Sequence, residues 1–128
     1  MRHAWLSIMA VCLVGCATTR DPIDTLVTRL SSSGLWREGP SAIINLPQTA
    51  SIEQVLDALF HTTPLARGWV SSHKILKIRR QVHVPPNFYT VVLVQTNLGE
   101  KIVLLRYERL ASQASRWWIR VYDAKTSG

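Results

Sequence analysis

The sequence predicts an α+β fold, in which one core helix packs on a curved antiparallel sheet of four to five strands and a short amphipathic helix precedes them. Two patterns support this prediction. Apolar residues recur with a helical period in the first half of the chain and with an extended period from residue 69 onward. With 128 residues, 47% hydrophobic and 18% charged, the chain has the length and composition of one folded domain.

The first helix is predicted to begin at Asp21-Pro22. Asp21 is placed to cap the helix, and Pro22 suits the first helical position, where a missing N–H is tolerated. An apolar stripe follows at i, i+3, i+4 and i+7, formed by Ile23, Leu26, Val27 and Leu30. A helix of about ten residues is marginal alone in water, so this stripe must rest on the folded domain or on a lipid surface. We expect it to rest on the domain.

A short strand at residues 41–46, closed by Pro47, is expected to precede the core helix. Ser51 and Gln54 have the spacing of a capping box at the start of this helix. Its apolar face is formed by Ile52, Val55, Leu56, Leu59 and Phe60. Pro64 ends the helix, because the residue before a proline is pushed out of helical geometry.

The rest of the chain is predicted to form four strands, near residues 70–84, 88–96, 101–110 and 116–123. The short connections between them predict an antiparallel meander without crossover helices. In the first of these strands most of the even-numbered residues from 76 to 84 are apolar and the alternating residues are polar, which predicts one buried and one exposed face. The apolar residues are Leu76, Ile78, Val82 and Val84, and the polar ones are Lys77, Arg79, Gln81 and His83. In the middle strands the residues on both faces are apolar. A second layer must therefore cover the sheet, and the N-terminal helix, sheet curvature and a partner subunit are the candidates.

This order of elements resembles the cystatin-like and nuclear-transport-factor-2-like folds, in which a curved antiparallel sheet wraps a helix. The resemblance concerns the topology of residues 41–123. Cystatin-type protease inhibitors carry a Gln-x-Val-x-Gly hairpin, whereas this chain has Gln81-Val82-His83-Val84-Pro85 near the corresponding turn and no later Pro-Trp pair. No inhibitor residue is therefore transferred to this chain.

The N-terminus is predicted to be a secretory signal. A basic start, Met1-Arg2-His3, precedes an uncharged apolar run at residues 4–17, which is shorter than the roughly 20 residues that span a bilayer. The run ends in Leu13-Val14-Gly15-Cys16, which resembles the lipobox of bacterial lipoproteins. The resemblance implies cleavage before Cys16 and a diacylglycerol on its sulfur. Several acyl chains on one residue would bind a membrane far more strongly than a single chain does.

The predicted divisions are a signal peptide 1–15, a lipidated N-terminus and tether 16–21, a short amphipathic helix and linker 22–40, an α+β domain 41–124 and a tail 125–128.

The alternative to an exported lipoprotein is a cytosolic protein with Cys16 as a buried thiol. Cys12 lies within the signal, so the mature chain would form no internal disulfide. Ala17 stands where an Asp would favour inner-membrane retention, which predicts the outer membrane, facing the periplasm, in a Gram-negative cell.

Positive charge is concentrated in the sheet half of the chain. Residues 71–128 contain ten Lys or Arg against three Asp or Glu, whereas residues 16–70 contain four against five. One face is predicted to hold a basic and aromatic candidate binding surface, formed by Lys77, Arg79, Arg106, Trp118, Arg120 and Tyr122. Three interpretations are open: a solvated outer face, attraction to anionic lipid headgroups or acidic envelope polymers, and nucleic-acid binding. Nucleic acid is not an expected partner of an exported protein.

Signals for catalysis are weak. His61, His73 and His83 lack metal-ligand spacing, and the sequence has no Gly-x-Ser-x-Gly elbow and no phosphate-binding glycine loop. We expect no catalytic residues, no metal and no cofactor. The sequence therefore favours a membrane-anchored binding, accessory or scaffold module, with a protein partner or a second copy bound through the sheet. A small envelope enzyme with a pocket between helix and sheet, or an inhibitor of an envelope enzyme, is the alternative.

Overall fold

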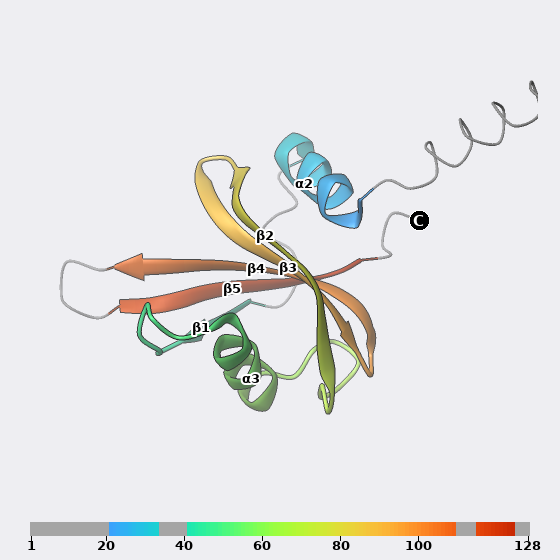
Figure 1. Cartoon of the computed structure of the whole chain (residues 1–128). Coiled ribbons are helices and arrows are strands. Elements are labelled where there is room, and N and C mark those ends of the chain that lie inside the picture. The colour runs from blue at the N-terminus through green and yellow to red at the C-terminus, as the bar shows by residue number, and fades with distance from the viewer. Residues whose placement is uncertain (1–20, 34–40, 110–114, 125–128) are drawn as a thin grey trace, which may run out of the picture.

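In the part of the chain that the structure describes, a single antiparallel sheet has one helix on each side (Figure 1). The computed structural model describes residues 21–33, 41–109 and 115–124. The elements are α2 (Pro22–Ser33), β1 (Ser41–Ile44), α3 (Ile52–Thr62), β2 (His73–Val84), β3 (Asn87–Thr96), β4 (Gly99–Arg109) and β5 (Ser115–Asp123). The strands lie in the order β1-β5-β4-β3-β2. The predicted α+β class and the order strand, helix, four strands are confirmed.

α3 covers one side of the sheet, here called the α3 face. Ser51 Oγ accepts a hydrogen bond from the Gln54 N–H, and Gln54 Oε1 accepts one from the Ser51 N–H, so the predicted capping box is present. The helix buries Val55, Leu56, Leu59 and Phe60 against Val92, Val94, Val103, Leu105, Ile119 and Val121 of the strands. Burial of each such side chain contributes about 1.5–3 kcal/mol. This cluster is the larger of the two cores.

α2 covers the opposite side, here called the α2 face. Asp21 Oδ1 accepts the Ile23 N–H at 2.9 Å, and the Asp21 carbonyl oxygen accepts the Thr25 N–H at 3.1 Å, as expected of a helix start. The buried side chains of α2 are Ile23, Leu26 and Leu30, and they pack on Tyr89, Val91, Leu93, Ile102 and Leu104. The middle strands are thus apolar on both faces because a helix packs on each face. Of the three candidate covers, the chain's own N-terminal helix is the one observed.

The predicted single parity along β2 is wrong, because the strand contains two irregularities. The register with β3 shifts at residues 75–77 and again at 79–82, where Gln81 lies in the left-handed region with φ 57°. Each extra residue moves the side chains that follow it to the opposite face of the sheet. Val82 and Val84 are therefore buried on the α2 face, whereas Leu76 and Ile78 remain 45% and 41% exposed.

Several sequence predictions concern residues outside the described ones. These are the signal peptide, the lipobox and the tether up to residue 20, the linker at 34–40, the turn at 110–114 and the tail at 125–128. Within the described residues, neither helix has the length and apolar character needed to span a bilayer.

Candidate functional site

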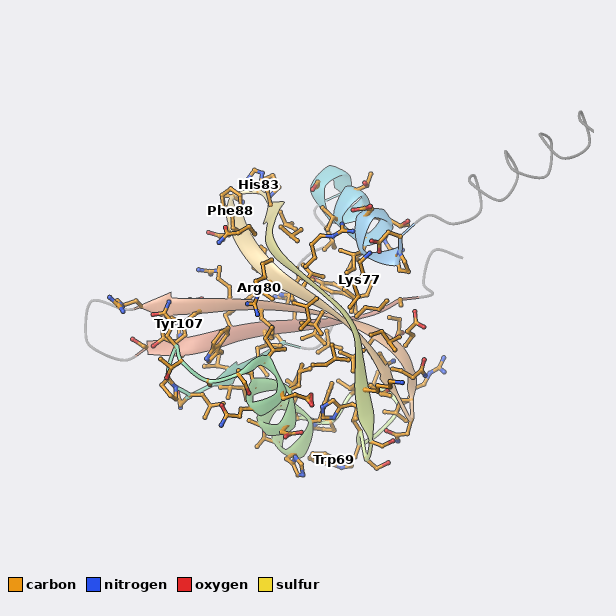
Figure 2. The ribbon with its side chains drawn as sticks, viewed as in Figure 1. Trp69, Lys77, Arg80, His83, Phe88 and Tyr107 are labelled. Carbon is orange, nitrogen blue, oxygen red and sulfur yellow. The ribbon has the colours of Figure 1, made fainter. Side chains whose placement is uncertain are left out.

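Two of the predicted binding residues hold α2 on the sheet. Lys77 and Arg79 both form ion pairs with Asp21, and Arg79 also pairs with Asp24; Figure 2 shows Lys77 next to α2. Burial raises the pKa of Asp21, but hydrogen bonds from Lys77 and the Ile23 N–H, together with both cationic charges, bring that pKa below its usual value. The hydrogen bond to Asp24 raises the pKa of Arg79. These two cations are therefore engaged within the chain.

An arginine–tryptophan cluster lies farther along the α2 face, and its members are Arg106, Glu108, Arg116, Trp118 and Arg120. Arg106 of β4 is paired with Trp118 of β5 across the sheet. The guanidinium carbon of Arg106 lies 5.8 Å from the Trp118 ring centroid and 5.9 Å from that of Tyr89. The guanidinium carbon of Arg120 lies 5.3 Å from the Trp118 ring centroid. These distances are in the range of cation–π attraction.

Glu108 lies between two of these arginines. Its Oε1 is 2.9 Å from an Nη of Arg106, and its Oε2 is 3.6 Å from Nε of Arg116. The Nε atoms of Arg106 and Arg116 are buried and have no hydrogen-bond acceptor among the described residues. Within the cluster, Arg106 and Arg116 share the single carboxylate of Glu108, so these two guanidinium groups carry more positive charge than that carboxylate neutralises.

The six predicted surface residues share the α2 face but have different surroundings. Arg106, Trp118 and Arg120 form one cluster, whereas Lys77 and Arg79 bind α2. The sixth, Tyr122, is buried in the core, and burial raises its pKa to about 12, so its hydroxyl stays neutral. The structure therefore groups three of the six in one cluster, whereas Lys77 and Arg79 are paired with α2 and Tyr122 lies in the core.

Sequence reasoning missed Arg116. It is paired with Glu108 across β4 and β5, on the same face as Trp118. The strand alternation contained this signal, since residues 116, 118 and 120 share one parity. The missed residue adds a third arginine to the cluster, and Glu108 links it to Arg106.

The histidines have local partners rather than a common site. His73 Nε2 lies 3.0 Å from Glu53 Oε1 and 3.6 Å from Asp57 Oδ1, and its ring packs on Phe60. His73 thus joins the start of β2 to α3. Among the described residues, no three His, Cys, Asp or Glu side chains are grouped so as to hold a metal ion. An open hollow near the β3–β4 turn contains no histidine and is lined by Arg67, Gln95, Leu98, Gly99, Glu100, Lys101 and Asp123.

The described residues define an α+β domain with a helix on each face of its sheet and a basic, aromatic cluster on one of those faces. Comparison of the chain with protein-family models, curated proteins and solved structures gave no match. The functional argument therefore rests on the residues of the site.

Proposed function

We propose that this protein is a lipid-anchored binding module of the bacterial cell envelope, and that its arginine–tryptophan cluster binds an anionic group. The anchor is inferred from the lipobox-like Leu13-Val14-Gly15-Cys16. The ligand chemistry is inferred from Arg106 and Arg120, which lie over the Trp118 ring, and from Arg116, which shares Glu108 with Arg106. Guanidinium forks suit the paired oxygens of phosphate and carboxylate, and an indole face supports the guanidinium planes.

A binding role fits this geometry better than a catalytic one. Arg106 and Arg116 share one carboxylate, Glu108, so a bound anion would give their guanidinium groups a further acceptor. The partly buried His73 instead faces two carboxylates of α3 and a phenyl ring, which is an arrangement that joins two elements of the core. The anionic group has two plausible sources in an envelope, a lipid headgroup and an acidic polymer.

The test compares binding of the full chain, purified in neutral detergent, to three probes. These are vesicles containing phosphatidylglycerol, vesicles of phosphatidylcholine alone, and soluble polyphosphate. We expect salt-sensitive binding to one or both anionic probes. The double variant Arg106→Gln/Arg116→Gln should lower the affinity about tenfold. Vesicle binding without polyphosphate binding would identify a headgroup, and the reverse would identify a polymer.

The matched control is Arg109→Gln. Arg109 lies on the same strand as Arg106, but its guanidinium donates to Gln48 Oε1, outside the cluster. The proposed lipid anchor also attaches the chain to neutral vesicles, so their binding is the baseline. No salt-sensitive binding above this baseline to either anionic probe, or an equal loss in Arg109→Gln, would contradict the assignment of this cluster.

A further inference from the structure

A second exposed surface lies on the β2–β3 hairpin, on the sheet side opposite to α2. We call it the hairpin patch, and its members are the exposed residues Ile78, Arg80, His83 and Phe88. Ile78 and Phe88 are 41% and 55% exposed, and the Phe88 ring stacks on His83 at 4.6 Å between centroids. Figure 2 shows His83 and Phe88 together at the tip of the hairpin, with Arg80 between them and α3.

The patch has a positive charge that the described chain does not neutralise. β2 and β3 contain four Lys or Arg and no Asp or Glu. Lys77 and Arg79 are paired with α2 on the other face, whereas Arg80 has no ion-pair or hydrogen-bond partner in the described part of the chain. The carboxylates of α3 nearest to β2, Glu53 and Asp57, face His73 at the opposite end of the strand.

The edge of β2 is poorly suited to pairing with another strand. β2 is the last strand of the sheet, and its two register shifts interrupt the free edge at residues 75–77 and 79–82. Bulges and basic side chains are common protections of edge strands. A second copy of this chain would also bring like charge against Arg80. The exposed apolar side chains are therefore not explained by edge pairing.

A lipid surface also fits the hairpin patch poorly. Recognition of anionic headgroups typically uses clusters of four to eight Lys or Arg. The patch has one arginine, Arg80, beside two exposed apolar side chains, Ile78 and Phe88. Aromatic and arginine side chains on one surface are instead typical of the few residues that dominate protein–protein binding.

We propose that the hairpin patch docks an acidic polypeptide segment of a partner protein. An apolar side chain of the segment packs on Phe88 and Ile78, and a neighbouring carboxylate pairs with Arg80. This surface lies on the opposite face from the arginine–tryptophan cluster. The proposal therefore does not depend on anion binding by that cluster or on the lipid anchor.

The experiment titrates the full chain, in neutral detergent, into fluorescein-labelled peptides in which Leu or Phe is flanked by Asp and Glu. Fluorescence anisotropy measures binding, and the same peptides with Asn and Gln in place of the acids measure the contribution of charge. We expect saturable binding of the acidic peptides and weaker binding of the amide versions. Phe88→Ser and Arg80→Glu should each lower the affinity about tenfold.

Two control variants match these changes elsewhere on the surface. Trp69→Ser removes a side chain that is equally exposed, at 56%, at the far end of β2 (Figure 2). Lys74→Glu reverses a charge on the same strand as Arg80. Both controls should bind the acidic peptides like the parent chain, and thermal unfolding should show that all four variants are folded.

Three outcomes would overturn the proposal. The first is no saturable binding of any acidic peptide, and the second is an equal loss of binding in the control variants. The third is that Phe88→Ser abolishes a dimer seen by sedimentation, or binding to phosphatidylglycerol vesicles, while peptide binding is unchanged. That result would assign the patch to a second copy or to the membrane.

Discussion

Asp21 and Arg79 are 58 residues apart in the sequence and form an ion pair that joins the start of α2 to β2. The other carboxylate oxygen of Asp21 accepts the Ile23 N–H. One side chain therefore begins the helix and fixes it to the sheet. Because Lys77 also reaches Asp21, two cations that would otherwise add to a basic surface serve this attachment.

Replacement of Asp21 tests this double role. Asp21→Ala should lower the free energy of unfolding by about 2 kcal/mol, because the helix cap and the ion pairs are lost together. Asp21→Asn keeps a good capping residue and should lower it by less than about 1 kcal/mol. Urea unfolding measures both. Equal effects of the two substitutions would show that the side chain does not act as a cap.

The same carboxylate predicts a dependence of stability on pH. The folded-state pKa of Asp21 is below its ordinary value of 3.8, so the stabilisation is complete above that value and is lost as the pH falls through the folded pKa. The stability difference between the parent chain and Asp21→Asn should be constant from neutral pH to about pH 5 and should shrink below pH 4. Unfolding free energies measured across this range test it. A difference that persists unchanged into strong acid would contradict it.

The two helices should make separable contributions to stability. Leu26→Ala on α2 and Leu56→Ala on α3 each open a cavity in a buried cluster and should cost about 2–5 kcal/mol. Hydrogen exchange should show faster exchange in α2 for the first variant and in α3 for the second. If Leu26→Ala had no effect on stability, the sheet would not depend on α2 as its second cover.

Glu108→Gln tests the arginine–tryptophan cluster in the opposite direction from the arginine substitutions, because it should strengthen anion binding where they weaken it. It removes the carboxylate that Arg106 and Arg116 share, so both guanidinium groups become available to an external anion. We expect polyphosphate to bind about threefold to tenfold more tightly, with a steeper dependence on salt. Weaker binding would indicate that Glu108 is needed to orient the arginines.

The sequence predicted those parts of the fold that depend on local pattern. Ser51 and Gln54 marked the start of α3, Asp21 marked the start of α2, and the apolar parities of the middle strands required a second layer. Each of these depends on spacing within one element. The stripe of Ile23, Leu26, Val27 and Leu30 was expected to rest on the domain, but the second layer itself remained open, because sheet curvature or a partner subunit could also cover the sheet.

The features that sequence reasoning missed depend on tertiary contacts. The bulge at Gln81 has no glycine to mark it, so strict alternation placed Ile78 on the same buried face as Val82. The ion pairs of Lys77 and Arg79 depend on where α2 docks, which no local pattern reports. The candidate binding surface was therefore predicted to be larger than the arginine–tryptophan cluster.

The most direct test of a lipid-anchored binding module is intact mass spectrometry of the protein extracted from its native membranes, with Cys16→Ser as the control. We predict a chain that begins at Cys16 and carries diacylglycerol, and a Cys16→Ser product without lipid. A native chain that still begins with Met1 and carries no acyl groups would contradict the account.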